Sequence, residues 1–172
     1  NHPQLDQVWA ENTLRSYYKS VASIDRNVGR LLDTVDRLGL AENTVVIYTS
    51  DHGYMIGHNG VYGKGTATIA GADIRSATRR PNLFDNAIRV PLLIRWPAVI
   101  SPGTRIEEMV TNLDFFPTFL AMADAQSLLP DDYPVYGHDF TPLLRGENIP
   151  WRTVIFGDYD MYHYVNDSMR MI

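Results

Sequence analysis

The stretch VVIYTSDHGYMIGHNGVYGKGT, residues 45–66, leads from a run of β-branched and aromatic residues into a loop with an acid, histidines, glycines and a lysine. Its first residues are apolar at successive positions, which predicts a strand covered on both faces. Asp51 and His52 follow directly. Because open α/β sheets bind their ligands just beyond the carboxyl ends of strands, this position favours a functional loop.

A long helix is predicted before this strand. Apolar residues recur at helical spacing through residues 14–38, with charged residues largely on other faces. Asn12 or Thr13 can cap its start, and Gly39 can supply the left-handed residue that ends it. A helix followed by a buried strand is typical of a layered α/β fold.

The rest of the chain predicts shorter elements. In order, these are a long loop at residues 65–82, a strand at 90–96, a helix at 115–122, a proline-rich surface connection at 128–150 and a strand at 153–157. Asp114 can cap the helix at 115–122, and Pro117 falls in its first turn, where a missing N–H costs little.

Composition limits the possible functions. The 172 residues are enough for one domain with a core, and the formal charge of -5 argues against broad nucleic-acid binding. No apolar run approaches the roughly 20 residues that a membrane-spanning helix needs. Because the chain has no cysteine, it can form no disulfide, thiolate zinc site or thiol nucleophile of its own.

Asp51 and His52 are candidate metal ligands. The turn after the strand breaks strict alternation, and Gly53 permits a tight backbone, so both side chains can reach one ion. The structural alternative is that Asp51 caps the turn while His52 is a partly buried hydrogen-bonding residue. Such a short motif leaves both interpretations open.

Lys64 is a candidate for binding an anion. It lies between two glycines, which leave its ammonium uncrowded and their backbone N–H groups available, as in an oxyanion pocket. A solvated lysine on a glycine-rich turn is the alternative. A Walker phosphate loop is excluded, because His58 stands where the first glycine is required and Gly65 replaces the Ser or Thr after the lysine.

Two histidines are candidates for substrate binding. His58 can line the site or brace the turn between Asp51 and Lys64. His163 lies among tyrosines near the C-terminal end, where it can face a polar ligand or belong to a surface aromatic cluster.

Several blocks of sequence, taken in order, resemble the later part of the catalytic domain of type I sulfatases, members of the alkaline phosphatase superfamily. These blocks are YYKSVASIDRNVGRLLDTVDRLGL, VVIYTSDHG, HNGVYGKGT, IRVPLLIRWPAVISPGTR and VTNLDFFPTFLAMA. The resemblance implies an α/β fold with a mixed, mostly parallel sheet between helical layers, of which this chain would be a fragment.

The resemblance also implies a divalent cation and roles for the loop residues. Asp51 and His52 match the metal ligands of the family, and Lys64 matches the catalytic lysine that binds the sulfate oxygens. Calcium is the expected ion, although a histidine ligand is unusual for it. Zinc or manganese is expected if the chain is phosphatase-like.

The family's nucleophile is not found in the sequence. A formylglycine made from Cys or Ser in a C/S-x-P-x-R motif is implied, and no such motif occurs in the chain. Residues 1–172 are therefore expected to form a single segment from the later part of the catalytic domain, with the nucleophile region and C-terminal subdomain absent. Such a segment is expected to be inactive alone.

The resemblance implies hydrolysis of sulfate esters, on a carbohydrate or another sulfated small molecule. A phosphodiesterase or phosphonate monoester hydrolase on the same scaffold is the alternative, and a non-catalytic relative is a third. The family's enzymes are often periplasmic, secreted or lysosomal, but the sequence itself fixes neither the compartment nor the oligomeric state.

Overall fold

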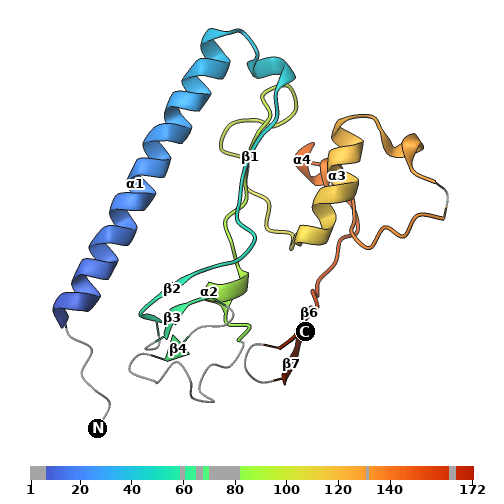
Figure 1. The fold of residues 1–172 in the computed structure, drawn as a ribbon. Helices are drawn as coiled ribbons and strands as arrows, with labels where there is room; N and C mark the ends of the chain where they lie inside the picture. The colour runs from blue at the N-terminus through green and yellow to red at the C-terminus, as the bar shows by residue number, and fades with distance from the viewer. Residues whose placement is uncertain (1–6, 59–60, 65–67, 70–81, 131, 163–165) are drawn as a thin grey trace. The chain divides into compact units, whose positions relative to one another are not determined.

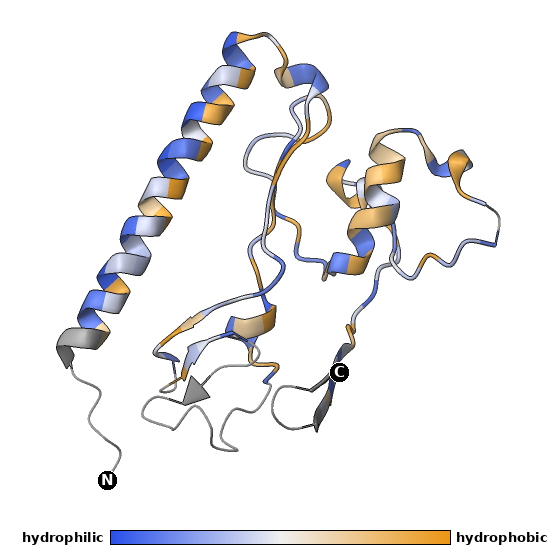
Figure 2. Ribbon diagram, viewed as in Figure 1, coloured by the Kyte–Doolittle hydropathy of each residue, from blue (hydrophilic) through white to orange (hydrophobic). Residues whose placement is uncertain are grey.

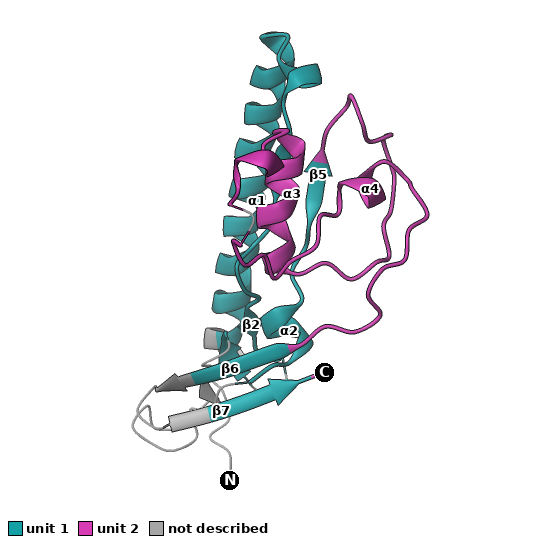
Figure 3. Cartoon of the chain, turned by 90° about the vertical axis from the view of Figure 1, so that its right-hand side faces the viewer, with its two compact units in different colours: residues 1–94, 157–171 teal, residues 95–156, 172 magenta. Residues whose placement is uncertain are grey.

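A computed structural model describes residues 7–58, 61–64, 68–69, 82–130, 132–162 and 166–172. The chain divides into two compact units, shown in Figure 3, one of residues 1–94 and 157–171 and the other of residues 95–156 with Ile172. Helices and strands occur in both halves of the sequence, so the described chain is a mixed α and β structure (Figure 1).

The first unit contains most of the strands. Its elements are α1 (Gln7–Arg37), the 3₁₀ helix η1 (Ala41–Asn43), β1 (Val46–Tyr48), β2 (Met55–Ile56), β3 (Val61–Gly63), β4 (Thr68–Ile69), α2 (Asp85–Ile88), β5 (Leu93–Arg95, whose last residue begins the second unit), β6 (Gly157–Tyr162) and β7 (Asn166–Met171). The second unit contains η3 (Asn112–Asp114), α3 (Phe115–Met122), η4 (Gln126–Leu128) and α4 (Thr141–Leu144).

Helix α1 is longer than predicted. It begins at Gln7, so the expected caps Asn12 and Thr13 lie inside the helix instead of at its start. The predicted end is confirmed, since Gly39 has a φ of 68° and the N–H of Leu40 donates to the carbonyl oxygen of Val35 at 3.0 Å. An apolar stripe follows one side of the helix (Figure 2). Several of its large side chains are exposed in this chain: Leu14, Tyr17, Tyr18, Val21, Ile24 and Leu31.

The expected burial of β1 is not observed. Val46 and Ile47 are only half-buried and Tyr48 is exposed, so the strand is not covered on both faces by residues of this chain. It pairs with β5 in a two-stranded sheet. The described strands do not show the mostly parallel sheet that the resemblance implied. The pairs whose register is defined, β2–β3, β3–β4 and β6–β7, are antiparallel.

A small antiparallel sheet follows the Asp-His loop. Met55 pairs with Gly63 in β2–β3, and Val61 pairs with Ile69 in β3–β4. Met55 and Val61 are buried together with Ala87 of α2, and this cluster fixes the sheet to α2. The long loop predicted at residues 65–82 lies largely outside the described residues, but its described part includes β4, which the sequence did not predict.

Gly53 lies in direct backbone contact with α2. Its N–H donates to the carbonyl oxygen of Ala87 at 2.8 Å, and a Cβ at this position would be 2.0 Å from the carbonyl oxygen of Asn86. That separation is far too short for a carbon–oxygen contact and involves backbone, which cannot rotate away. Only glycine therefore permits the approach that holds this loop.

In the second unit, α3 is observed at the predicted residues. The segment 128–150, predicted to be a surface connection, instead contains α4 and the buried residues Phe140, Leu143 and Leu144. The ring of Phe115 meets Phe140 edge-on at 6.1 Å between centroids. The prolines that suggested an irregular segment are compatible with this helix, because Pro142 lies in its first turn.

Asp114 does not cap α3 as predicted. Its carboxylate is fully buried and accepts hydrogen bonds from the Arg152 guanidinium, at 2.7 Å to Oδ1, and from the backbone N–H groups of His138 at 2.8 Å and Thr111 at 2.7 Å. Arg152 also donates to Nδ1 of His138. Burial by itself raises the pKa of Asp114, but these hydrogen bonds and the positive charge of Arg152 outweigh it, so the pKa lies below its ordinary value.

The strand predicted at residues 153–157 is also wrong. The chain becomes a strand only at Gly157, where β6 begins and pairs with β7. Val154 and Phe156 are exposed, and neither residue belongs to a strand.

We expect Gly53→Ala to lower the free energy of unfolding by about 1–3 kcal/mol, because the added methyl group overlaps the α2 backbone. Gly29→Ala is the matched control: nothing lies within 4 Å of a Cβ at Gly29, in the interior of α1. The control should stabilise the protein by about 0.5–1 kcal/mol through helix propensity. Urea denaturation measures both, and equal effects of the two substitutions would contradict the close contact at Gly53.

We expect the Asp114 ion pair to make stability depend on acid. Because the folded-state pKa is lowered, its contribution is complete above the ordinary carboxyl value of 3.8 and is lost as pH falls through the lower folded value. Asp114→Asn should cost about 3–5 kcal/mol at neutral pH, since it leaves Arg152 without its charged partner. Denaturation curves from pH 7 to pH 2 should show the two proteins converging in acid.

The control for this comparison is Asp124→Asn, at an exposed position with a φ of 51° that asparagine tolerates. Its free energy of unfolding should change with pH in the same way as that of the parent protein over this range. A constant difference between the parent and Asp114→Asn down to pH 2 would contradict the role assigned to the pair.

Candidate functional site

The loop between β1 and β2 carries the Asp-His pair on a braced backbone. The hydroxyl of Ser50 donates to the carbonyl oxygen of His52 at 2.7 Å, and Gly53 is fixed against α2 as described above. The loop therefore leaves β1 at one end and is anchored at the other by the core around Met55.

The β2–β3 hairpin returns the chain to this loop. Because Met55 pairs with Gly63, the next residue, Lys64, lies beside the residues that precede β2. Nζ of Lys64 is 2.8 Å from Nε2 of His52. Residues twelve positions apart in the sequence are thus brought into direct contact by the antiparallel register.

The partners of His52 define its tautomer. Nδ1 lies 2.9 Å from the carbonyl oxygen of Gly53, which can only accept, so Nδ1 carries the proton. Nε2 then has a free lone pair and accepts from the Lys64 ammonium. The carbonyl of Gly53 therefore orients the ring and directs Nε2 towards the lysine.

Asp51 completes the group. Its Oδ2 is 3.7 Å from Nε2 of His52, and its side chain is 85% exposed, compared with 37% for His52. An acid, an unprotonated imidazole nitrogen and an ammonium thus gather at a surface that a ligand can reach. Together these groups can bind an anion through Lys64 and a cation through Asp51 and His52.

The donor atoms fit one side of a metal site. A carboxylate oxygen and an imidazole nitrogen 3.7 Å apart can share one ion, given metal–ligand distances of about 2.0–2.6 Å. Within the described ranges no cluster of three or more His, Asp or Glu side chains could hold a metal. The lone pair of Nε2 already accepts from Lys64, so metal binding by His52 requires the lysine to move away from it.

Of the two other candidate histidines, the structure describes one. His58 accepts a long hydrogen bond of 3.5 Å from the backbone N–H of Ile56 and lines a cavity together with His52. It therefore contacts the backbone of β2 and also borders the open space. His163 lies outside the described residues.

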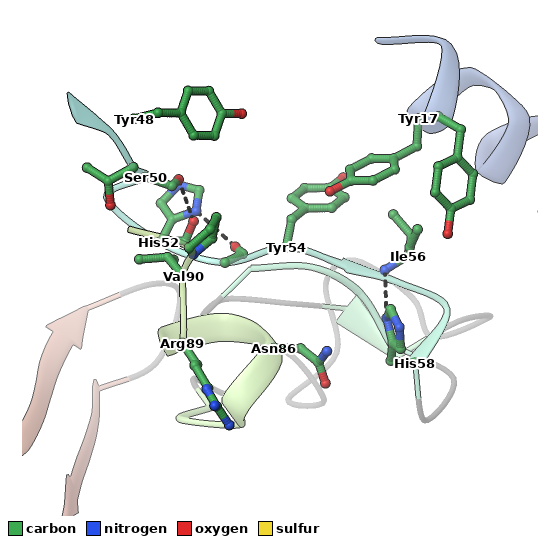
Figure 4. A pocket seen from close by; sticks show the side chains of 14 residues that line it. Tyr17, Tyr48, Ser50, His52, Tyr54, Ile56, His58, Asn86, Arg89 and Val90 are labelled. Atoms are coloured by element: carbon green, nitrogen blue, oxygen red, sulfur yellow. Dashed lines mark hydrogen bonds between the residues drawn. The ribbon is translucent and has the colours of Figure 1, made fainter. Parts of the chain in front are cut away.

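Next to the loop is a cavity of about 460 Å³ that the sequence did not predict (Figure 4). Tyrosines from α1 and from the loop form part of its lining. The rings of Tyr17 and Tyr54 are stacked, with centroids 6.4 Å apart and planes at 14°, and Tyr18 meets Tyr17 edge-on at 5.9 Å. The helical pattern placed Tyr17 and Tyr18 on an apolar face, and the tyrosine directly after Asp-His-Gly was the signal that could have linked them to the site.

No helix in the part of the chain that the structure describes has the length and apolar character needed to cross a membrane.

Several sulfatases are similar to this chain in sequence. Steryl-sulfatase of Rattus norvegicus is 37% identical over 163 residues, which cover 88% of this chain and 24% of that protein. N-acetylglucosamine-6-O-sulfatase of Bacteroides thetaiotaomicron is 30% identical over 88% of this chain and 23% of its own length. The chain therefore spans about a quarter of the length of these relatives.

Solved structures of related hydrolases are also similar to this chain. The structure of BT4656 in complex with its substrate D-glucosamine-2-N,6-O-disulfate has a TM-score of 0.66 and 30% identity, and the match covers 83% of this chain and 25% of that one. Phosphonate monoester hydrolase SpPMH from Silicibacter pomeroyi has a TM-score of 0.63 and 25% identity, over 85% of this chain and 25% of its own. The sequence model of the family described as Sulfatase matches residues 2–125. The chain belongs to the sulfatase family.

Proposed function

We propose that the protein carrying this chain hydrolyses sulfate esters of a carbohydrate. The observation that carries the proposal is the contact between Lys64 and His52 beside Asp51, in a chain of the sulfatase family. A carbohydrate substrate is supported by the similarity to an N-acetylglucosamine-6-O-sulfatase and to a structure with bound D-glucosamine-2-N,6-O-disulfate.

Asp51 and His52 are proposed to hold one divalent cation, with further ligands from outside this chain. The cation would polarise an oxygen of the ester and lower the pKa of the attacking group. A carboxylate suits calcium, the expected ion, whereas an imidazole nitrogen suits zinc or manganese better. The Gly53 carbonyl holds His52 in the tautomer that presents the unprotonated Nε2.

Lys64 is proposed to bind the sulfate group. If Lys64 moved away and Nε2 of His52 bound a cation instead, the Lys64 ammonium would be available to an anion beside that cation. Its positive charge would offset the negative charge that grows on the sulfate oxygens as the ester bond breaks. The nucleophile, a formylglycine by family resemblance, would come from residues outside this sequence, because the chain contains no C/S-x-P-x-R motif.

We further propose that residues 1–172 are the later part of a larger catalytic domain. In that domain β1 and β5 would belong to a mixed, mostly parallel sheet between helical layers. The exposed aliphatic side chains Leu14, Val21, Ile24 and Leu31 of α1 and the half-covered β1 support this, because both elements have apolar surface that this chain does not cover.

A phosphonate monoester hydrolase is the second candidate. It is favoured by the similarity to SpPMH and by the nitrogen donor of His52, which suits the metals of phosphatase-like enzymes. Parallel assays with a sulfate monoester and a phosphonate monoester of the same alcohol decide between the two. A preference for the phosphonate would reject the sulfatase assignment.

We expect Lys64→Ala to lower kcat/KM for a sulfated sugar by about a hundredfold or more in the full-length protein, because a donor to the developing charge is removed. Lys19→Ala is the control, at the chain's other lysine, which lies exposed on α1. It should leave turnover unchanged. Initial rates of sulfate release measure both, and equal activity of the two variants would reject the role of Lys64.

We expect Asp51→Ala and His52→Ala to weaken divalent-cation binding. The loss should be at least as large as the ~10–100-fold that removal of an outer-shell partner causes. Equilibrium dialysis with calcium, manganese and zinc in turn measures affinity without turnover, and it also identifies the ion. Asp33→Ala, on the exposed surface of α1, is the control. Unchanged affinity in both loop variants would contradict their assignment as ligands.

A further inference from the structure

The cavity beside the loop has walls of two kinds. Tyr17 and Tyr18 come from α1 and Tyr54 from the loop, and they contribute aromatic rings. Asn86 of α2 and the imidazole of His52 contribute polar groups. The volume of about 460 Å³ falls within the range of roughly 300–1,000 Å³ typical of small-molecule sites.

The three tyrosine side chains are not fully buried. Tyr17, Tyr18 and Tyr54 remain 38%, 60% and 52% exposed. Within the described part of the chain, none of their hydroxyl groups makes a hydrogen bond, and neither does the side-chain amide of Asn86. Aromatic faces and polar groups therefore border the same open space.

This combination suits a hydroxylated ring. The C–H face of a pyranose is apolar and flat enough to lie on a tyrosine ring, while its hydroxyl groups need donors and acceptors at the rim. A fully apolar polycyclic ligand would offer no hydrogen-bond partner to the amide and hydroxyl groups at the rim. An acyclic ester offers no face for the rings.

His52 connects the cavity to the proposed chemistry. It lines the cavity, and its Nε2 contacts Lys64 at 2.8 Å. A ring held against the tyrosines can therefore present an ester oxygen to the Asp51–His52–Lys64 group.

We propose that this cavity is the subsite for the sugar ring that bears the sulfate ester, with Tyr17 and Tyr54 as the residues that bind the ring. The assignment of the ring to a substrate rests on the proposed function. Tyr17 and Tyr54 act on binding and not on bond breaking, so their loss changes KM and leaves kcat nearly unchanged.

The test uses the full-length protein that carries this chain. Tyr54→Ala and Tyr17→Ala should each raise KM for glucosamine 6-sulfate about five- to tenfold, and weaken the binding of unsulfated glucosamine by a similar factor in calorimetry. Tyr54→Phe, which keeps the ring, should lose little. Tyr136→Ala, at an exposed tyrosine of the second unit, is the control. A simple alkyl sulfate should show no dependence on either tyrosine.

Two results would overturn the subsite: unchanged KM and sugar affinity in both alanine variants, or an equal rise in KM for the alkyl sulfate. If Tyr54→Ala does not fold, as judged by circular dichroism, Tyr17→Ala on the separate element α1 decides. The proposed function is tested independently. Tyrosine-dependent glucosamine binding without hydrolysis of any sulfate ester would reject the sulfatase activity and support the subsite. Hydrolysis of a sulfated sugar that is insensitive to both tyrosine substitutions would support the sulfatase activity and reject the subsite.

Discussion

The contact between Gly53 and the backbone of α2 is the constraint on which the candidate site depends. It fixes the exit of the Asp-His loop to within hydrogen-bond distance of Ala87, next to the buried cluster of Met55 and Val61. With the loop end fixed, the β2–β3 register determines where Lys64 lies. The position of the Asp51–His52–Lys64 group is therefore set by backbone geometry.

The residues that hold the loop in place differ from those that carry its chemistry. The buried residues behind the loop, Met55, Val61 and Ala87, are apolar, whereas Asp51 and Lys64 are exposed and His52 is only part-buried. Charged groups at a surface keep their solvation and remain accessible to ions of either sign. Because His52 is oriented by a backbone carbonyl, its Nε2 lone pair accepts from the Lys64 ammonium. The loop is thus anchored through its backbone, while its charged side chains lie at the surface.

The sequence predicted local features well and tertiary ones poorly. The end of α1 at Gly39 and the position of α3 followed from glycine conformation and apolar periodicity, which act over a few residues. The site residues 51, 52 and 64 could be named from residue type and from resemblance to a family. Their contact could not, because it depends on the β2–β3 register of very short strands. Asp114 was misassigned for the same reason, since its partner Arg152 is remote in sequence and no local pattern connects them.

The buried pair of Asp114 and Arg152 has a consequence for the history of this sequence. A carboxylate with no exposed surface accepts from one guanidinium and from two backbone groups, so replacing either side chain alone leaves a charge without compensation. A substitution at one of the two positions alone is therefore expected to destabilise the protein unless the other residue changes as well. Among homologues the two sites should be inherited as a coupled unit, exchanged together for a neutral pair or kept together.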